Sequence, residues 1–541
     1  MHPGIFAAKE PDRPAIVMGD SGAVVTYAEL EARSNRVARL ARDCGLKPGD
    51  GLAAIVENRP EMLELAWGAQ RSGLQFTAVN RHLTAEEAGY IVSDCGARLL
   101  VTTSSLAGLA AGLAGPALDG PARPPGSGPA GDAGGPPGPA RRLMIGGTIP
   151  GWESYEDAVA GLAPDPIPDE CEGDFMLYSS GTTGRPKGIR RPVTGVPLGE
   201  YPDHPGHWLR ELLGLREGDV YLSPAPLYHA APLAWSMGCH RSGATVVVME
   251  RFDAEQALRL IERYRVTHSQ WVPTMFVRLL KLPDATRSRY DLSSLRSAVH
   301  AAAPCPVPVK QAMIGWWGPV LFEYYSMTEG FGTSAITSQE WLRKPGSVGR
   351  PLMGAPHVLD DGGRELLAGE PGVIWFEGGS PSQYHSDPGK TAAATNARGW
   401  RTVGDVGYLD EDGYLFLTDR ASRLIISGGV NIYPQEIENL LVLHPEVLDA
   451  AVLGVPDPEM GEQVKAVIQP ADPETGGQAA TFQALAVRLA AYCREHLAGF
   501  KCPRSFEFTS QELRTPVGKI RQGPLREQFG ARPGPYHAAP E

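Results

Sequence analysis

The sequence has 541 residues, of which 42% are hydrophobic and 21% charged, and its formal net charge is −12. A chain of this length can bury a large core and is expected to form more than one domain. The acidic balance, with no stripe of lysine or arginine, argues against nucleic acid or anionic lipid as a partner and favours a small molecule.

Three features of the sequence bear on its location. No apolar run reaches the length of about 18 residues that a membrane-spanning helix requires, and the opening MHPGIFAAKEPDRP lacks the charged and apolar segments of a secretory signal. The seven cysteines are scattered without a CxxC pair, which favours free thiols in a reducing compartment over a zinc site or disulfides. These features predict a cytoplasmic protein with no membrane span.

Residues 24–104 alternate helical and strand-like patterns. Thr26 followed by Glu29 marks the start of a helix, and Gly45 marks its end. A strand-like run over 52–57, a helical run over 64–73 and a strand-like run over 98–104 come next. This alternation predicts an α/β fold, mixed with α+β parts, in which helices cover a mostly parallel sheet.

The middle of the chain contains a low-complexity segment and two predicted hairpins. Residues 115–139 consist mainly of Gly, Ala and Pro, so they are predicted to form a flexible loop inside a large N-terminal domain. The stretches 358–379 and 407–419 place GG or DG turns between strand-like runs, and they therefore predict β-hairpins.

A smaller α+β unit follows residue 420. Its strand-like runs cover 423–429, 449–455 and 462–470, and its helical runs cover 434–445 and 481–499. We therefore predict a large domain over 1–418, a hinge over 419–423 and a small mobile domain over 424–541. The tail after Gly530 is expected to be disordered.

The segment YSSGTTGRPKG, residues 178–188, combines hydroxyls, glycines and Lys187. Backbone N–H groups, hydroxyls and an ammonium at close range suit a polyphosphate. The Walker pattern does not fit, because it would need glycine at Pro186 and Ser or Thr at Gly188. Taken alone, this segment is either a phosphate loop or an ordinary surface loop.

The whole string resembles the phosphate-loop motif of the adenylate-forming superfamily, which includes acyl-CoA synthetases, the adenylation domains of peptide synthetases, and luciferases. Six further segments resemble motifs of that family and follow its order. They are SPAPLYHAAPL (223–233), HAAAPCP (300–306), YYSMTEG (324–330), GWRTVGDVGYLD (399–410), TDRASRLIISGGVNIYPQEIE (418–438) and TPVGK (515–519). The sequence is therefore identified as a member of this superfamily, in its acyl-CoA synthetase branch, over nearly the entire chain.

The resemblance implies an ATP site with Mg²⁺. The loop residues that would grip the pyrophosphate end of ATP are Ser179, Ser180, Gly181, Thr182, Thr183, Gly184 and Lys187. Those around the adenosine and the α-phosphate would be Ala302, Tyr325, Thr328, Asp405 and Arg420. In this reading Tyr325 stacks on adenine, Asp405 and Arg420 bond the ribose, Glu329 binds Mg²⁺, and Lys519 is the catalytic lysine.

The resemblance also implies an acyl pocket and a path for a thiol. The predicted pocket residues are His229, Trp235, Met237, Gly238, Trp271, Val272, Ala301 and Ala303, with His229 as the gate. Because most are apolar and several are small, we expect a bulky hydrophobic acyl group, either a longer fatty acid or a polycyclic acid. Ser427, Gly428 and Gly429 resemble the segment that lines the pantetheine tunnel, and Ser422 stands at the hinge.

Each residue also has a structural interpretation when taken alone, such as a core histidine at 229 or a solvated carboxylate at 329. Together they predict activation of a hydrophobic acid to an acyl-adenylate, followed by thioester formation with CoA. Two alternatives stay open: transfer of the acyl-adenylate to a carrier protein or partner ligase, and a catalytically silent nucleotide- or acyl-binding protein. Ser422 and Arg423 depart from the family pattern at the hinge, which weakens the prediction of thioester formation more than that of adenylation. Self-association into a homodimer is also left open.

Overall fold

The computed structural model of the chain describes residues 1–113, 139–179, 186–200, 205–380, 382–420, 423–428, 430–472, 479–516 and 518–537. Of residues 179, 205, 420 and 479, only the backbone is described. The predicted flexible loop at 115–139 lies outside the described residues, except for residue 139.

The chain divides into two compact units. One comprises Met1–Gln270, Asp284–Ala298 and Pro381–Ala393, and the other comprises Trp271–Pro283, Val299–Ser380 and Ala394–Glu541. This division follows contacts rather than sequence order, so the hinge at 419–423 stays a prediction.

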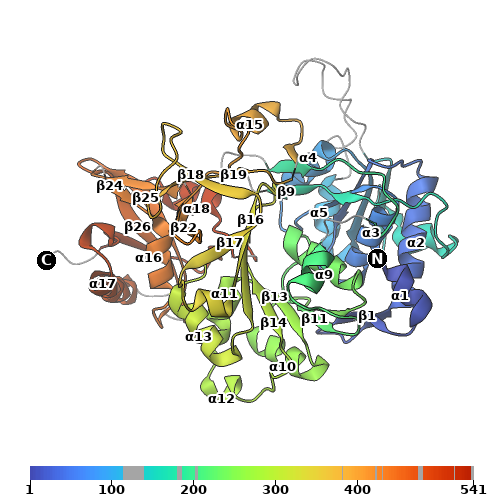
Figure 1. Ribbon diagram of the computed structural model, residues 1–541, viewed down its shortest axis with the longest axis horizontal. Helices are drawn as coiled ribbons and strands as arrows, with labels where there is room; N and C mark the ends of the chain where they lie inside the picture. The colour runs from blue at the N-terminus through green and yellow to red at the C-terminus, as the bar shows by residue number, and fades with distance from the viewer. Residues whose placement is uncertain are drawn as a thin grey trace. The chain divides into compact units, whose positions relative to one another are not determined.

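The first unit contains mostly strands and helices from the N-terminal half (Figure 1), together with three short elements from later in the chain, α12, α15 and β20. Its strands are β1 (Pro14–Met18), β2 (Val24–Thr26), β3 (Gly51–Ile55), β4 (Gln75–Ala78), β5 (Ala97–Thr103), β6 (Arg141–Ile145), β7 (Glu153–Ser154), β8 (Asp174–Phe175), β9 (Leu177–Ser179), β10 (Lys187–Arg190), β11 (Val220–Ser223), β12 (Thr245–Val248), most of β13 (His268–Trp271) and β20 (Gln383–Tyr384). Its helices are α1 (Pro3–Lys9), α2 (Tyr27–Asp43), α3 (Pro60–Arg71), α4 (Ala85–Asp94), η1 (Ser104–Leu106), α5 (Ala107–Leu113), α7 (Tyr155–Ala160), α8 (Pro205–Glu211), α9 (Ala230–His240), α10 (Ala254–Tyr264), α12 (Asp284–Arg287) and α15 (Pro388–Ala393).

A parallel sheet forms much of this first unit. Its six strands lie in the order β7-β6-β5-β3-β4-β8, and every adjacent pair is parallel. The helix α2 begins where the sequence predicts, because the Thr26 hydroxyl accepts a hydrogen bond from the Glu29 amide and the Glu29 carboxylate accepts one from the Thr26 amide. The alternation of strands and helices thus confirms the expected α/β arrangement.

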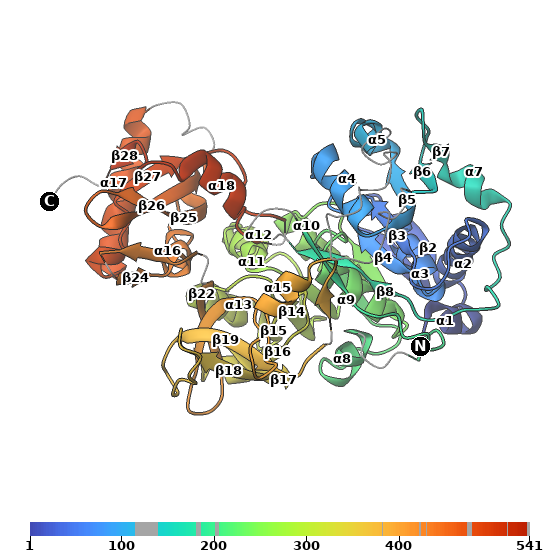
Figure 2. The same ribbon diagram turned by 90° about the horizontal axis from the view of Figure 1, so that it is seen from above.

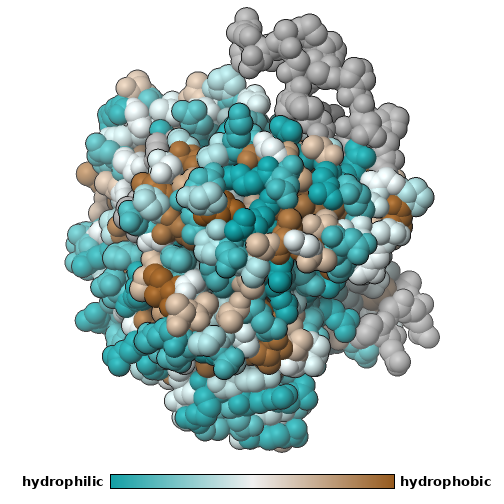
Figure 3. All heavy atoms as spheres, turned by 90° about the vertical axis from the view of Figure 1, so that its right-hand side faces the viewer, coloured by the Kyte–Doolittle hydropathy of each residue, from teal (hydrophilic) through white to brown (hydrophobic). Residues whose placement is uncertain are grey.

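A second layer of this unit carries the strand order β13-β11-β12-β1-β2. The pairs among β11, β12, β13 and β1 are parallel, and β2 closes the edge in the antiparallel sense. A separate three-stranded sheet has the order β20-β10-β9. On the face of the molecule that Figure 3 shows, apolar side chains are dispersed among hydrophilic ones.

The second unit contains the remaining elements, and β14 (Ser297–His300) spans the division. Its strands are β15 (Leu321–Ser326), β16 (Thr333–Thr337), β17 (Ser347–Met353), β18 (Ala355–Leu359), β19 (Gly372–Glu377), β21 (Asp405–Leu409), β22 (Leu415–Arg420), β23 (Ile425–Ser427), β24 (Val430–Ile432), β25 (Val447–Asp457), β26 (Gly461–Pro470), β27 (Ser505–Phe508) and β28 (Tyr536–His537). Its helices are α11 (Pro273–Leu280), α13 (Val307–Trp317), α14 (Ser338–Trp341), α16 (Pro434–Leu441), α17 (Ala479–His496), η4 (Gly499–Lys501) and α18 (Gln522–Phe529).

Antiparallel strands dominate the second unit. The order β18-β19-β21-β22-β17-β16-β15 contains both expected hairpins, since β18 pairs with β19 and β21 pairs with β22. Register is set there by the facing pairs Leu359 with Val373 and Leu409 with Leu415.

A further sheet, in the order β24-β23-β26-β27-β28 with β25 paired to β26, forms the C-terminal part of this unit. Ile437 of α16 and Leu489 of α17 are buried in one cluster with Val452 of β25, whereas Leu525 of α18 packs with Leu453 on the other face. Figure 2 shows α17 and α18 on opposite sides of β26.

The expectation of a disordered tail after residue 530 is wrong for residues 531–537. Tyr536 lies opposite Phe506 in the ladder between β27 and β28, and its ring packs edge-on against Phe508 at 5.3 Å. This pairing joins segments about 30 residues apart, which local composition does not reveal. Among the helices of the described residues, none is long and apolar enough to cross a membrane.

Candidate functional site

Among the loop residues predicted to bind phosphate, Lys187 is the one whose side chain the structure describes. It stands in β10, and its backbone pairs with Ser179 of β9, so both strands that flank residues 180–185 are in place. Its ammonium contacts the carboxylate of Asp387, with 2.8 Å between Nζ and Oδ2. That hydrogen bond is the main cause that lowers the pKa of Asp387. Ser180, Gly181, Thr182, Thr183 and Gly184 lie outside the described residues.

His229 precedes helix α9, whose N-cap position it occupies without a side-chain cap bond. Its ring lies 4.4 Å from the ring of Tyr228, between centroids. Trp235 and Met237 of the same helix are buried. Gly238 has a packing role, because a β-carbon there would lie 2.7 Å from the Gly206 amide nitrogen of α8. Its assignment to the acyl pocket, like those of the other three, stays a prediction.

The other predicted pocket residues belong to the second unit. Trp271 is 1% exposed and packs edge-on against Trp317, with ring centroids 5.2 Å apart. It therefore contributes to a core cluster. The next residue, Val272, precedes α11. Ala301 is buried, whereas Ala303 is half-buried.

Ala302 has an unusual backbone. Its φ is +76°, a left-handed value that alanine rarely adopts, and its side chain is exposed. Such strain is commonly kept where a segment must present its backbone in one shape. This backbone shape is compatible with a binding segment, and the expectation that the segment lies beside adenine stays a prediction.

Tyr325 and Asp405 meet directly. The tyrosine at the end of β15 donates a hydrogen bond to Asp405 at the start of β21, with 2.6 Å between the hydroxyl oxygen and Oδ2. Asp405 is 7% exposed, and the ring of Tyr325 lies 6.3 Å from that of Phe376. The ladder also places the backbone of Arg420 opposite Asp405, so the two predicted ribose contacts come from facing positions of β21 and β22.

Thr328 and Glu329 occupy the turn between β15 and β16. The Gly330 amide donates to the carbonyl of Met327 at 2.9 Å, which closes the turn around them. Glu329 is 8% exposed. No group of three or more histidine, cysteine, aspartate or glutamate side chains in the described part of the chain could hold a metal ion. Mg²⁺ is usually held by one or two carboxylates together with substrate phosphates, so a single buried glutamate fits a metal that arrives with ATP.

Ser427 and Gly428 form the end of the β23–β24 hairpin, where Ser427 pairs with Val430. Gly428 takes a φ of +57°, and its amide donates to the Met460 carbonyl at 2.8 Å. The tunnel role of these two residues stays a prediction, and Gly429 and Ser422 lie outside the described residues.

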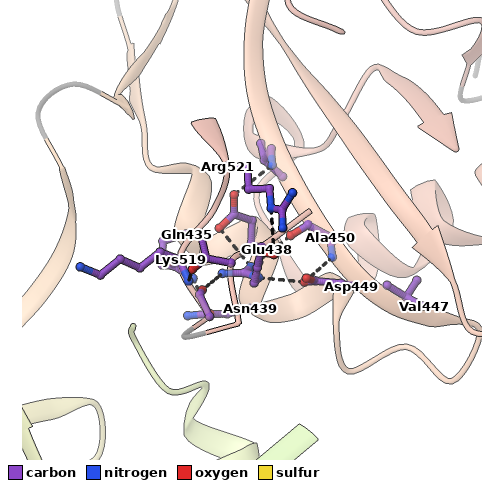
Figure 4. A network of polar contacts seen from close by, with 12 residues as sticks. Gln435, Glu438, Asn439, Val447, Asp449, Ala450, Lys519 and Arg521 are labelled. Carbon is purple, nitrogen blue, oxygen red and sulfur yellow. Dashed lines mark hydrogen bonds and ion pairs between the residues drawn. The ribbon is translucent and has the colours of Figure 1, made fainter. Parts of the chain in front are cut away.

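Lys519 is exposed at the end of a tight turn (Figure 4). The Thr515 amide donates to the Lys519 carbonyl at 2.7 Å, and the Gly518 amide donates to the Thr515 carbonyl at 2.8 Å. A β-carbon on Gly518 would lie 3.4 Å from the Thr274 hydroxyl and 3.7 Å from Val272 Cβ. The turn therefore lies against the start of α11, next to a predicted pocket residue.

The structure thus brings together several predicted residues within each unit. In the second unit, Tyr325 meets Asp405, and the turn that carries Lys519 meets Val272. Sequence reasoning missed two relevant contacts, Asp387 on Lys187 and Thr274 beside Gly518. Asp387 lies 200 residues from its partner, and no local pattern connects the two.

The sequence and the fold are similar to those of known proteins. The AMP-binding enzyme family matches residues 5–383, and the AMP-binding enzyme C-terminal domain matches residues 436–519. The fatty acid–acyl-carrier-protein ligase ScoC of Streptomyces coeruleorubidus is 32% identical, covering 97% of this chain and 95% of the relative. Feruloyl-CoA synthase of Amycolatopsis sp is 34% identical, covering 97% of each chain. The structure of ATP-bound MatB from Rhodopseudomonas palustris has a TM-score of 0.75 at 27% identity, covering 98% of this chain and 99% of that one.

Proposed function

Because the chain belongs to the AMP-binding enzyme family, we propose that it activates a hydrophobic carboxylic acid with ATP and then transfers the acyl group to the thiol of CoA. Family membership makes the chain an adenylate-forming ligase and confirms the resemblance seen in the sequence. The contact between Tyr325 and Asp405 at 2.6 Å is the observation that best supports a nucleotide site in this chain.

The first half-reaction forms one bond and breaks one. A carboxylate oxygen of the acid attacks the α-phosphorus of ATP, and the bond to the pyrophosphate oxygen breaks, which leaves an acyl-adenylate. Negative charge gathers around phosphorus in the transition state, so fixed positive charge and donors accelerate the step. Magnesium, when bound with ATP, supplies further positive charge at the phosphates.

The chain's own residues would divide this work. Lys519 would place its ammonium between the carboxylate and the α-phosphate, and Lys187 would contact the leaving pyrophosphate. Tyr325, Asp405 and Arg420 would hold the nucleoside, and Glu329 would hold the metal. In the second half-reaction the thiolate sulfur attacks the acyl carbonyl carbon and AMP leaves.

The acid is proposed to be hydrophobic because the predicted pocket is apolar. Trp235, Met237, Trp271 and Val272 are all buried, and no carboxylate stands in YHAAPLAW (228–235) to pair with an α-ammonium. The relatives named for fatty-acid and feruloyl substrates agree with an acid of this kind.

A carrier protein is the second candidate acceptor. ScoC is named as an acyl-carrier-protein ligase. Ser422, the hinge residue that differs from the family pattern, lies between the two segments that match the family models. Both acceptors carry a phosphopantetheine thiol, so the first half-reaction is the same for each.

All seven cysteines are free thiols, which supports a proposed cytoplasmic location, where thiols stay reduced.

Product analysis tests the proposal. The protein is incubated with ATP, Mg²⁺, CoA and a panel of fatty, aromatic and polycyclic acids, and the products are measured by mass spectrometry. We expect AMP, pyrophosphate and an acyl-CoA in stoichiometric amounts with at least one hydrophobic acid. Acyl-AMP without acyl-CoA would instead favour the carrier protein, and ATP hydrolysis independent of every acid would contradict the proposal.

A further inference from the structure

A buried carboxylate links the hinge side of the C-terminal part to the turn that carries Lys519. Glu438 of α16 is fully buried, and its Oε1 accepts a hydrogen bond from the Val452 amide at 2.9 Å. It forms ion pairs with two arginines, Arg423 at Oε1 and Arg514 at Oε2, the latter at 3.6 Å. A buried charge that loses such partners destabilises its surroundings strongly, so this carboxylate holds both arginines in place.

All three nitrogens of the Arg514 guanidinium donate hydrogen bonds. Nε contacts Asp449 Oδ1 at 2.9 Å, Nη2 donates to the Ala450 carbonyl at 3.1 Å, and Nη1 donates to the Gly518 carbonyl at 3.1 Å. Two of these partners belong to β25, and the third directly precedes Lys519. The planar, forked donor geometry of arginine allows this bridge, which a lysine could not reproduce in full.

The backbone of Arg514 supports the same turn. Arg514 forms a β-bridge with Ile520 across the turn, and the Arg521 side chain donates to the Arg514 carbonyl at 3.2 Å. The turn is thus attached to Arg514 from both sides of Lys519.

Arg423, the second arginine that pairs with Glu438, also pairs with Asp419. It lies 3.6 Å from Asp419 Oδ1, and Asp419 Oδ2 accepts a hydrogen bond from the Gln435 amide at 3.0 Å. Burial alone would lower the pKa of Arg423, but attraction by Glu438 and Asp419 outweighs it and raises that pKa. Asp419 and Arg423 flank the predicted hinge residue Ser422. A continuous series of ion pairs and hydrogen bonds therefore connects the hinge, through Glu438 and Arg514, to the Gly518 carbonyl.

The backbone of Lys519 belongs to this turn, with its carbonyl accepting from the Thr515 amide. Figure 4 shows its side chain extending away from Glu438 and Asp449. The network therefore orders the backbone that carries the Lys519 side chain.

We propose that Arg514 and Glu438 are positioning residues for Lys519, which fix the turn at Thr515, Gly518 and Lys519 and tie it to the residues that flank the hinge. The inference rests on the proposed role of Lys519 in adenylation. Because a misplacement of about 1 Å can reduce a rate by roughly 100-fold, loss of the Arg514 guanidinium is expected to lower the rate constant of adenylation by about 30- to 100-fold.

The test compares Arg514→Met, Arg514→Lys and Glu438→Gln with a matched control, Arg488→Met. Arg488 also pairs with a carboxylate through two nitrogens, Glu446 at 2.9 and 2.7 Å, but on an exposed part of α17. We expect kcat for acid-dependent ATP–pyrophosphate exchange to fall in the three variants, while KM for ATP changes by less than about threefold, and both to stay unchanged in the control.

A double-mutant cycle separates positioning from a general structural role. If Arg514 acts through Lys519, then Arg514→Met slows single-turnover acyl-AMP formation in the parent but not in the Lys519→Ala background. Equal losses in both backgrounds would overturn the proposal. Loss of ATP binding together with kcat in both Arg514 variants would overturn it as well.

Amide hydrogen exchange provides a readout that does not need activity. Glu438→Gln is expected to speed exchange in the segment 513–521 by at least tenfold, although Glu438 does not touch the turn, and Arg488→Met is expected to leave it unchanged. Unchanged exchange in Glu438→Gln would contradict the proposed link. If the parent shows no acid-dependent exchange of pyrophosphate, the proposed function fails, and the hydrogen-exchange result still decides for or against the network.

Discussion

Replacing Tyr325 by phenylalanine tests the nucleotide site most specifically. The change keeps the ring that is proposed to stack on adenine and removes the hydroxyl that donates to Asp405 at 2.6 Å. A hydrogen bond to a charged group contributes about 1.5–3 kcal/mol. Tyr325 is half-buried, so we take the lower end, and about 1.4 kcal/mol corresponds to tenfold in an equilibrium or rate ratio. Tyr325→Phe should therefore lower kcat/KM for ATP by about tenfold, because Asp405, the proposed ribose contact, loses the donor that holds its carboxylate in place.

The assay is ATP–pyrophosphate exchange at varied ATP, in a cycle with Asp405→Asn and the double variant. The two changes should be coupled by about 1 kcal/mol or more, since each removes the same contact. Tyr27→Phe is the matched control, because its buried hydroxyl donates to the Ala244 carbonyl at 2.8 Å in the other unit. The control should lower the melting temperature without changing KM for ATP. Additive effects of Tyr325→Phe and Asp405→Asn would refute the reasoning.

Three further predictions concern other parts of the molecule. Asp387→Asn removes the carboxylate that pairs with the Lys187 ammonium, so KM for ATP should fall by up to about fivefold, in keeping with about 1 kcal/mol or less for a partly exposed pair at the surface. A rise in KM measured by steady-state kinetics would contradict this. Gly518→Ala places a side chain where φ is +77°, which costs about 1–2 kcal/mol, so adenylation should slow by roughly tenfold with ATP affinity retained in calorimetry; unchanged turnover would show that the turn relaxes freely. Burial lowers the pKa of His240 to about 4. Between about pH 6.5 and pH 4 the unfolded chain therefore binds a proton at this histidine that the folded chain does not bind. The free energy of unfolding consequently decreases as the pH is lowered through this range, by about 3 kcal/mol for this group. His240→Gln should remove that dependence in denaturant titrations at pH 7 and pH 4.5, and an equal loss in both proteins would count against it.

Local signals in the sequence were sufficient for much of the fold. The capping pair Thr26 and Glu29 marks its helix through hydrogen bonds three residues apart, and the hairpin at β21 and β22 follows from a short DG turn. The strand β28 was not predictable, because its pairing with β27 depends on distant residues rather than on local pattern.

The candidate site was predictable to the extent that contiguous motifs carry it. Tyr325 and Asp405 were each named from such motifs, but their contact was not predictable, because the strands β22, β17 and β16 lie between β21 and β15 in the sheet order. Apolar pattern alone does not separate a pocket wall from a core, which is why Trp271 suits either role. No sequence motif distinguishes Arg514 from an ordinary exposed arginine. Its contacts with the buried Glu438 and with the Gly518 carbonyl appear only in the structure.

The central claim is that this chain adenylates a carboxylic acid with Lys519 as its catalytic cation. Carboxylate-dependent exchange of labelled pyrophosphate into ATP, measured for the parent and for Lys519→Ala, tests it directly. We predict exchange that requires a hydrophobic acid and that falls by at least 100-fold in the variant, while calorimetry shows ATP binding within a few-fold of the parent. Exchange at the parental rate in Lys519→Ala, or no exchange with any acid in the parent, would contradict the account.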